Sequence, residues 1–444
     1  MQYDPKTPFR SMIDSKKGTV ARQIFADEGI YRLELERIFA RAWNFMCHES
    51  QLPNPGDFLL SYIGEESVIC VRDRKGGFQV MLNSCRHRGN AVCRAEKGNV
   101  RSFMCTYHGW TYGLDGSLIG VPGYKDLYHE QLDKSQWGLI RAAKVASYKG
   151  FVFATMDPEA PELEDYLGPV GRFPFDVIES RGGVKAVDGV LKNVIGCNWK
   201  LAVDNVFDWY HARITHASAS YAQPGQLGHF TEHRVVLGEY GHAISGPRMS
   251  QKTFESDARR AQGGGVNVDG ALGYEWRQRP EVVEALGELH ETRGHHHVFP
   301  NMWITSDGAQ IGMRFPKGPS KTELWWQTLA PKEFSEEDVK RLVHRSNHTF
   351  GPAGMLEQED GENWDQSTRA MRGPIAQAHP LHYAMNLGLA RAKRTDSGAA
   401  YIDTNVNEHA QLWSYRAWAE WMDAENWSAL RLHHSAVPVQ GETV

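Results

Sequence analysis

The stretch that decides the fold is Ser84-Cys85-Arg86-His87-Arg88-Gly89. A similar run follows further along the chain, Met104-Cys105-Thr106-Tyr107-His108-Gly109-Trp110. Each run carries one cysteine and one histidine. The spacing is Cys-x-His in the first run and Cys-x2-His in the second, with 17 residues between the two pairs. Structural zinc sites usually group like ligands, as Cys-x2–4-Cys and His-x3–5-His pairs, whereas each half here mixes a thiol with an imidazole.

Two mixed pairs suit a [2Fe–2S] cluster in which histidine replaces cysteine on one iron, because each loop then gives one ligand to each iron. The expected ligands are Cys85, His87, Cys105 and His108. Neutral imidazole ligands raise the reduction potential above that of an all-cysteine cluster, so such a centre can accept electrons from a ferredoxin. Zinc, or a chance arrangement, is the alternative that the residues leave open.

Composition excludes several classes of protein. The chain has 444 residues, of which 41% are hydrophobic and 23% charged, which suits a globular protein of two or three domains. A net charge of −5 without long Lys/Arg runs gives no support for nucleic-acid binding. Six scattered cysteines and the lack of a long apolar run favour a cytoplasmic protein that does not enter a membrane.

Residues 1–41 are expected to form a polar arm and one helix that pack on the large C-terminal domain. Apolar residues recur at near-helical spacing from Asp27 to about Trp43, which predicts an amphipathic helix. Residues 42–160 then carry short β-rich runs separated by Gly and Asp turns, typical of a small β-sandwich. Its strands are predicted at 58–63, 67–72, 78–83, 101–105, 110–113, 117–121 and 149–154.

Residues 161–444 mix both kinds of element, after a proline-bearing linker predicted at 158–174. Strands are predicted at 189–195, 229–237, 295–305, 309–315 and 322–329, and helices at 197–216, 334–350, 352–372 and 407–425. An antiparallel sheet that grips long helices makes this an α+β domain. A glycine-bearing run at 250–270 is expected to be a surface excursion.

A second metal site is suggested by His211 and His216, which stand five positions apart. On an ideal helix i and i+4 share a face, whereas i+5 is rotated by a further ~100°. The two imidazoles can meet at one metal ion only if the helix ends or distorts between them. Asp204, Asp208 and His211 follow at i, i+4 and i+7, along one stripe, so Asp208 is the natural acceptor for the free ring nitrogen of His211.

Two histidines and one carboxylate, with open positions, form the facial triad of non-haem Fe(II) oxygenases. The carboxylate must come from elsewhere in the chain. The residues alone leave five candidates, which are Glu357, Glu359, Asp360, Glu362 and Asp365. On its own, the His211 and His216 pair is a weak signal, and a pair without metal is the alternative.

The cysteine and histidine pattern resembles that of Rieske proteins. Respiratory-chain members carry an extra cysteine in each loop, where Asn90 and Tyr107 stand here, so this centre resembles that of the bacterial ring-hydroxylating oxygenases. The whole chain resembles the large (α) subunit of Rieske-type aromatic-ring-hydroxylating dioxygenases, the naphthalene, biphenyl and polycyclic-arene group. Further marks are Asn198-Trp199-Lys200, Asp208-x-Tyr210-His211-x4-His216 and the acidic run from Glu357 to Trp364.

The resemblance implies a Rieske β-sandwich followed by a helix-grip catalytic domain with mononuclear Fe(II). It implies that Asp360 completes the iron site and that the reaction adds both atoms of O2 to an aromatic ring, giving a cis-dihydrodiol. Implied partners are a small β subunit in an α3β3 assembly, a ferredoxin and an NAD(P)H-dependent reductase. Asp208 would then accept hydrogen bonds from His211 and from His108 of the next subunit, and so carry the electron between chains.

The substrate class is less defined by the sequence. The spacing from Asn205 to Asp208, with Phe207 before the aspartate and Asp204 where glutamate is commoner, also resembles benzoate- and terephthalate-type enzymes. The predicted cavity lining is mostly apolar and favours a neutral mono- or polycyclic arene. It comprises Asn205, Val206, Phe207, His297 and Leu356, with alternation sending His295 and His297 to one face and His296 to the other.

Other interpretations remain. An aromatic carboxylate would need a cation in the cavity, and the possible suppliers are Arg213, Arg248, Arg277, Arg279 and Arg314. A Rieske monooxygenase would share both metal sites. A pure electron-transfer protein would have one metal centre, and the long chain after the first domain argues against it. Three adjacent histidines could form another metal site, but hydrogen-bonding residues at the cavity rim are the preferred interpretation.

Overall fold

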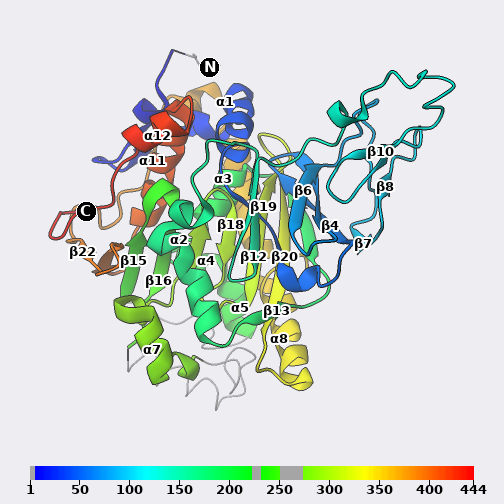
Figure 1. Cartoon of the computed structure of the whole chain (residues 1–444). Helices are drawn as coiled ribbons and strands as arrows, with labels where there is room; N and C mark the ends of the chain where they lie inside the picture. The colour runs from blue at the N-terminus through cyan, green and yellow to red at the C-terminus, as the bar shows by residue number, and fades with distance from the viewer. Residues whose placement is uncertain (1–5, 223–231, 251–273) are drawn as a thin grey trace. The chain divides into compact units, whose positions relative to one another are not determined.

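The computed structural model describes residues 6–222, 232–250 and 274–444 (Figure 1). The chain forms two compact units. One is Phe39–Leu163, and the other joins the described residues up to Ile38 with Glu164–Val444. The run 250–270, predicted as a surface excursion, lies outside the described residues except for its first position, as do the first residues of the strand predicted at 229–237.

The smaller unit consists of short antiparallel strands. A four-stranded sheet has the order β6-β5-β4-β7 and two three-stranded sheets have the orders β11-β12-β3 and β10-β9-β8. Their bounds are β3 Asn44–His48, β4 Asp57–Ile63, β5 Glu66–Arg72, β6 Phe78–Leu82, β7 Lys97–Asn99, β8 Phe103–Met104, β9 Thr111–Tyr112, β10 Leu118–Gly120, β11 Lys144–Tyr148 and β12 Phe151–Thr155. Short 3-10 helices span Glu49–Gln51 and Lys134–Gln136.

The strands predicted at 58–63, 67–72 and 78–83 are confirmed to within a residue at each end. Those predicted at 101–105, 110–113 and 117–121 shrink to two or three residues each. The reason is that the backbone around Cys105 turns back on itself, with the Gly109 N–H donating to the Cys105 carbonyl, and so leaves the ladder.

A ten-stranded antiparallel sheet forms the centre of the larger unit, with the order β13-β20-β19-β18-β17-β16-β15-β23-β22 and with β14 also paired to β20. The bounds are β13 Val184–Ala186, β14 Leu191–Ile195, β15 His233–Leu237, β16 Ala243–Pro247, β17 His295–Val298, β18 Met302–Ile304, β19 Gln310–Pro316, β20 Thr322–Pro331, β22 Lys393–Arg394 and β23 Ala400–Thr404. A small separate sheet joins β1 Ile13–Asp14, β2 Thr19–Val20 and β21 Leu381–His382.

Helices cover both faces of this sheet. Their bounds are α1 Glu28–Glu34, α2 Leu163–Ser180, α3 Trp199–Asp204, α4 Ala212–Thr215, α5 Ala217–Ala222, α7 Pro280–Leu286, α8 Glu336–Thr349, α9 Met355–Ala370, α10 Pro374–Gln377, α11 His409–Asp423 and α12 Trp427–His433. Short 3-10 helices span Phe9–Met12, Arg22–Phe25, Glu239–Gly241, Glu275–Gln278 and Gly287–Leu289, and a π-helix spans Leu35–Phe39.

Successive residues of β15 show which helices lie on which face. Val236 packs with α2 and α7 in one apolar cluster, whereas Val235 and Leu237 pack on the other side with Phe207, Trp303, Trp326 and Phe350, and with Ala410 and Trp413 of α11. Helix α9 contacts β14 on this second side. The α+β fold with a sheet gripping helices is therefore confirmed. Phe207, in the segment that leads to His211, lies on the second side.

Three of the elements predicted in the larger unit are wrong in extent. The strand predicted at 295–305 is two antiparallel strands, β17 and β18, because the chain turns at 299–301. The helix predicted at 197–216 is broken, because α3 ends at Asp204 and α4 begins only at Ala212. Between them the Asp208 carboxylate accepts the backbone N–H of Tyr210 at 2.7 Å, a local turn that competes with helix. The linker predicted at 158–174 is mostly helix α2, which kinks at Gly168 where φ is 54°.

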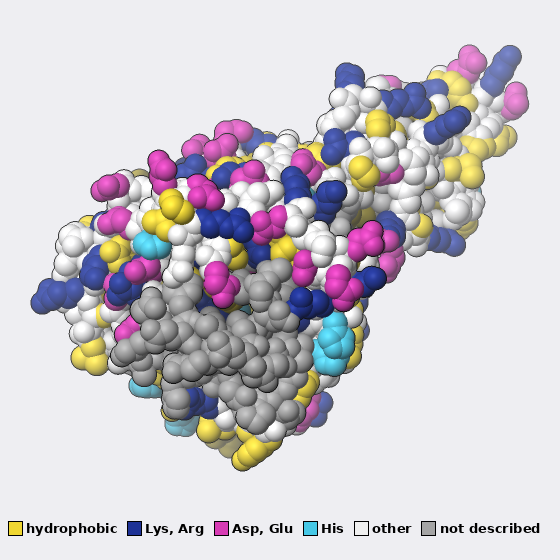
Figure 2. All heavy atoms as spheres, turned by 90° about the horizontal axis from the view of Figure 1, so that it is seen from below, with side chains coloured by type: hydrophobic (Ala, Val, Ile, Leu, Met, Phe, Trp, Pro, Cys, Tyr) yellow, Lys and Arg dark blue, Asp and Glu magenta, His cyan; other side chains and the backbone are white. Residues whose placement is uncertain are grey.

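No helix among the described residues combines the length and apolar character that crossing a membrane requires. On the face drawn in Figure 2, Lys and Arg side chains are interspersed with Asp and Glu over the described residues. This mixture agrees with the small net charge of −5 and shows no basic stripe on that face.

Candidate metal centres

The two cysteine–histidine loops of the smaller unit have the same backbone design. The Gly89 N–H donates to the Cys85 carbonyl at 2.8 Å, and the Gly109 N–H donates to the Cys105 carbonyl at 2.9 Å. Both glycines have a positive φ, 73° and 71°, which a residue with a Cβ rarely adopts. The glycine four residues after each cysteine thus closes a loop of matching shape.

The side chains of these loops converge. Cys85 and Cys105 are buried, and the His87 and His108 rings lie 4.5 Å apart between centroids. His87 stacks on Trp110 at 5.0 Å, and its buried Nδ1 has no hydrogen-bond partner among the described residues. The four ligand atoms do not form a group within 4.8 Å of one another, as a single zinc ion would need. A wider group with two irons fits these residues better.

Neighbouring groups favour the thiolate form of Cys105. Burial raises the pKa of the thiol, but hydrogen bonds from the Tyr107 N–H, the Asn90 amide and the His108 N–H outweigh it and lower the pKa. The Asn90 amide lies 3.6 Å from the sulfur. The thiolate is the form that binds iron.

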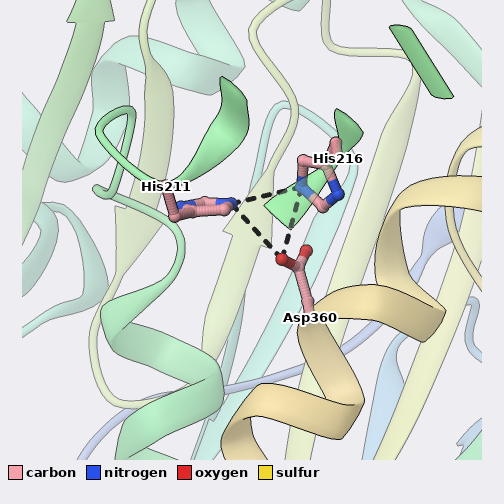
Figure 3. A group of neighbouring side chains, drawn as sticks. All are labelled: His211, His216 and Asp360. Carbon is pink, nitrogen blue, oxygen red and sulfur yellow. Dashed lines mark hydrogen bonds and ion pairs between the residues drawn. The ribbon is translucent and has the colours of Figure 1, made fainter. Parts of the chain in front are cut away.

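The larger unit brings His211, His216 and Asp360 together (Figure 3). The two Nε2 atoms are 3.2 Å apart, and each lies 3.3 Å from Oδ1 of Asp360. Ligands bound at about 2.1 Å and at right angles around one ion lie about 3.0 Å apart, so this triangle suits three neighbouring positions of a metal. Among the described residues it is the one group of this kind.

The chain reaches this arrangement by ending a helix. His211 stands just before α4 and His216 just after it, where ψ changes to 34°, so the helix does end between the two histidines as the spacing predicts. Asp360 comes from α9. The next residue, Gly361, lets this helix lie close to β14, because a Cβ there would be 2.7 Å from the Ile195 side chain.

Each of the three side chains is oriented by another residue. The Nδ1 of His211 lies 3.1 Å from Oδ2 of Asp208, and the Nδ1 of His216 lies 2.9 Å from Oε2 of Glu359. The amide of Asn205 donates to Oδ2 of Asp360 at 3.2 Å and leaves Oδ1 facing the imidazoles. Such outer contacts fix the ring tautomers and the ligand directions.

The contact of Glu359 with His216 is one that the sequence did not reveal. In the sequence, nothing distinguishes Glu359 from the other four acids of this run. In the structure, its other carboxylate oxygen accepts a hydrogen bond from the Ser218 hydroxyl. Three of the other acids make contacts away from the two histidines. Glu357 accepts a hydrogen bond from the Trp326 indole at 2.7 Å, Glu362 accepts one from the Gln366 amide, and Asp365 forms an ion pair with Arg369.

The carboxylates of Asp208 and Asp360 favour a positive charge at this site. Burial lowers the pKa of His211, but the Asp208 and Asp360 carboxylates outweigh it and raise that pKa to about 10. The Asp208 carboxyl has the opposite shift: burial raises its pKa, but His211 and two backbone N–H groups lower it, so Asp208 is a carboxylate. Two carboxylates around two imidazoles suit a divalent metal ion.

A cleft of about 400 Å³ opens beside this group and is lined by Asp204, Asp208, His211 and Asp360, among others. Asp204 is not on a stripe with Asp208, as a continuous helix would require. Its Oδ2 accepts from the hydroxyls of Tyr383 and Tyr415, at 2.7 and 2.8 Å. Burial, followed by the charge of Asp208, raises the pKa of Asp204 to about 7.

The predicted cavity residues lie around one apolar cluster. Val206 and Phe207 are part of it, Leu356 packs against its edge, and the His297 ring is 5.4 Å from that of Phe207. Asn205 turns to Asp360 instead. The alternation along β17 is confirmed: His295 and His297 contact Trp209 and Phe207, whereas His296 contacts Phe173 on the opposite face.

The three histidines of β17 form no metal group among the described residues. They are mostly or fully buried rather than at a rim, and burial above all lowers the pKa of each to about 3. At neutral pH they are uncharged rings that pack against aromatic neighbours.

Comparison with known proteins agrees with both centres. The family model "Rieske [2Fe-2S] domain" matches residues 42–145, and "Ring hydroxylating alpha subunit (catalytic domain)" matches residues 167–422. Biphenyl dioxygenase subunit alpha of Paraburkholderia xenovorans (strain LB400) is 34% identical over 95% of each chain. The large oxygenase component of the naphthalene 1,2-dioxygenase system of Pseudomonas aeruginosa is 30% identical over 94% of this chain and 95% of its own.

A solved structure of naphthalene 1,2-dioxygenase with indole bound in the active site matches 97% of each chain, with a TM-score of 0.84 and 29% identity. The cofactors of these two families are a [2Fe–2S] cluster and mononuclear non-haem iron. The chain belongs to the family of ring-hydroxylating oxygenase alpha subunits, with a Rieske domain and a mononuclear-iron catalytic domain.

Proposed function

We propose that this protein is the terminal oxygenase component that cis-dihydroxylates an aromatic ring. The balanced reaction joins one arene, one O2, two electrons and two protons into one cis-dihydrodiol. The observation that carries the proposal is the triangle of His211, His216 and Asp360, with edges of 3.2 to 3.3 Å, in a chain that also has a Rieske domain. The named relatives act on biphenyl, benzene and naphthalene, which favours a neutral mono- or polycyclic arene.

Cys85, His87, Cys105 and His108 would hold the cluster, and His211, His216 and Asp360 would hold the iron. When bound, the cluster supplies electrons singly and the iron supplies O2 activation. The chain's own residues do the rest. Asn205, Asp208 and Glu359 orient the three ligands, and the buried aromatic cluster on the same side of the sheet excludes water from the arene.

Asp208 has a second role in this proposal. Its carboxylate can accept a hydrogen bond from His211 and another from His108 of a neighbouring subunit, because a carboxylate accepts from two imidazoles at once. Asp208→Asn should then keep both metals and a reducible cluster while electron transfer to the iron slows. The plainer alternative is that Asp208 only orients His211, in which case Asp208→Asn transfers electrons at a near-normal rate.

The expected partners follow from the same family. Electrons come from NAD(P)H through a reductase and a ferredoxin, and a small β subunit completes an α3β3 assembly. The proposed functional divisions are residues 1–41, 42–160 and 161–444. The division at 161 lies near the start of the match to the catalytic-domain model at residue 167.

The ligand assignment is tested on the adjacent acids of α9. Asp360→Ala should lose the mononuclear iron and all product, with the Rieske spectrum intact, because it removes the oxygen that faces both imidazoles. Glu359→Ala should still bind iron, but with an affinity about 10–100-fold weaker, because it removes only the hydrogen-bond partner of His216. Glu362→Ala, on the exposed side of the same helix, is the control and should bind iron normally.

Iron content and the electron-paramagnetic-resonance signal of the reduced cluster are the two measurements. Loss of iron in Glu359→Ala together with full retention in Asp360→Ala would move the ligand by one residue and contradict the assignment. Loss of the cluster signal in Asp360→Ala would show that the variant is misfolded rather than iron-free.

A further inference from the structure

The proposed reaction takes up two protons for each dihydrodiol, so the ligand group needs a route to solvent. The cleft of about 400 Å³ is lined by two of the ligands, His211 and Asp360. The half-buried Glu408 and the exposed His382 also line it, so it runs from the ligands to the surface. Among the described residues, none of the apolar cluster around Phe207 lines the cleft. Waters of about 30 Å³ each therefore fit in the cleft without entering that cluster.

The carboxyl group of Asp204 presents one oxygen to this cleft and has the other one fixed. Its Oδ2 accepts hydrogen bonds from the hydroxyls of Tyr383 and Tyr415, at 2.7 and 2.8 Å. Its Oδ1 has no hydrogen-bond partner in the part of the chain that the structure describes. Asp204 is half-buried and lines the cleft. The free oxygen can therefore carry an acidic proton and donate it to a water molecule.

The groups around Asp204 keep this proton available near neutral pH. Burial, and after it the negative charges of Asp208 and Glu408, raise the pKa of Asp204. The hydroxyls of Tyr383, beside the cleft, and of Tyr415, in α11, lower it, and the balance is about 7. Asp208 has a lowered pKa and stays a carboxylate. A proton donor is most effective when its pKa lies close to the working pH.

We propose that Asp204 is the proton donor of the oxygenase and gives its proton, through water in the cleft, to the oxygen atoms that join the ring. For each diol the carboxyl O–H bond breaks twice and two O–H bonds of the product form. The carboxylate regains each proton from solvent along the cleft, and the electrons are those of the proposed reaction. Asp204 thus acts through water, whereas Asp208 orients His211. The inference rests on the proposed function, because the protons are those of the diol.

The alternative is that Asp204 only ties α3 to the two tyrosines. Single-turnover diol formation from biphenyl by the holo-oxygenase separates the two roles. Below about pH 6 the parent protein should be about 10²-fold faster than Asp204→Asn, and this ratio should fall as the pH rises through about 7, because only the protonated carboxyl donates. Effects of pH on the cluster cancel in the ratio. Asp204→Glu should restore both the rate and its pH dependence.

Two variants that keep Asp204 should move this pH dependence in opposite directions. Tyr383→Phe removes a donor that favours the carboxylate, so it should raise the pKa of Asp204 and move the fall in the ratio to higher pH. Glu408→Gln removes a negative charge and should move the fall to lower pH. Here the ratio compares each variant with Asp204→Asn. Asp423→Asn, whose carboxylate accepts from the Phe9 N–H and does not line the cleft, should match the parent at each pH.

Infrared difference spectroscopy of the resting holo-protein gives a readout that does not depend on turnover. The carbonyl stretch of a protonated carboxyl should fade in the parent as the pH rises through about 7, and should be absent from Asp204→Asn. Absence of this band from the parent, or a rate ratio that is the same at every pH in Asp204→Asn with full metal content, would overturn the inference. If Asp204→Asn loses its metals, shifts in the same direction in Tyr383→Phe and Glu408→Gln would overturn it. Parent protein that forms no diol at any pH would instead contradict the proposed function.

Discussion

At the residue scale, the proposed iron-binding group consists of three side chains that each have one supporting contact. Asp208, Glu359 and Asn205 support His211, His216 and Asp360 respectively. The sequence could indicate the histidines and Asp208 because their spacing is local. It could not separate the five acids on physical grounds, because which of them faces the histidines depends on how α9 packs against β14, a contact between residues far apart in the chain.

Asp204 gives a prediction for the pH dependence of stability. Its pKa is about 7 in the folded protein, against about 3.9 in an unfolded chain. The folded state therefore binds the proton more tightly, and the stability that Asp204 contributes is full below about pH 4 and is lost as the pH rises through about 7. Asp204→Asn can still accept hydrogen bonds from the hydroxyls of Tyr383 and Tyr415. Its thermal stability should therefore fall less than that of the parent protein between about pH 5 and about pH 8.

The measurement is the difference in Tm between the parent protein and Asp204→Asn across this range. Asp423→Asn is a matched control, since that carboxylate accepts from backbone N–H groups near the start of the chain, away from the cleft. A difference in Tm between Asp204→Asn and the parent that is the same at every pH would contradict the raised pKa.

At the element scale, a buried acid joins three helices that are far apart in sequence. Glu34, at the end of α1, is fully buried and accepts from the indoles of Trp199 in α3 and Trp418 in α11, each at 2.8 Å. It also forms an ion pair with the buried ammonium of Lys200. The Asn198-Trp199-Lys200 motif thus includes two residues, Trp199 and Lys200, through which α3 contacts Glu34 of α1.

Glu34→Ala should lower the free energy of unfolding by about 3–5 kcal/mol, because it leaves the Lys200 charge buried and unpaired. Chemical denaturation followed by tryptophan fluorescence measures this change. Glu28→Ala, in the same helix, breaks only an exposed pair with Arg32 and should cost less than about 0.5 kcal/mol. Equal effects of the two substitutions would show that the buried contact contributes little.

Sequence patterns predicted some elements better than others. The amphipathic helices α8, α9 and α11 and the strands β4 to β6 follow from periodicity. The break between α3 and α4 does not, because it depends on Asp208 capturing the Tyr210 N–H and on tyrosines from distant segments that hold Asp204. His211 and His216 face one another for a different reason, which is that α4 occupies only Ala212–Thr215 and ends before His216.

At the scale of the whole molecule, the two metal centres lie in separate units of the chain. The order of the domains was predictable, since each has its own metal-ligand motif and its own pattern of secondary-structure elements. How a unit of one chain meets a unit of another depends on surfaces that carry no such local pattern. The family resemblance implies that electrons pass from the cluster of one chain to the iron of its neighbour.

Mixed oligomers test this transfer between chains. Cys105→Ser should lack the cluster and Asp360→Ala should lack the iron, so each is inactive alone. Co-expressed with different affinity tags and purified as one assembly, they should regain a measurable fraction of activity, because an intact cluster then meets an intact iron on the next chain. Inactive mixed assemblies with the expected metal contents would mean that transfer occurs within one chain.

A control assembly pairs Cys105→Ser with the double variant Cys105→Ser/Asp360→Ala. It contains no intact cluster in any chain and should stay inactive. Activity in that control would show that electrons reach the iron without the Rieske centre.

The proposed reaction adds both oxygen atoms of one O2 to an aromatic ring at the site formed by His211, His216 and Asp360. The most direct test supplies the oxygenase with a ferredoxin, a reductase, NADH, an arene and ¹⁸O2, and analyses the product by mass spectrometry. The expected product is a cis-dihydrodiol in which both oxygens carry the label. A phenol or dealkylated product with a single labelled oxygen would contradict it and identify a monooxygenase.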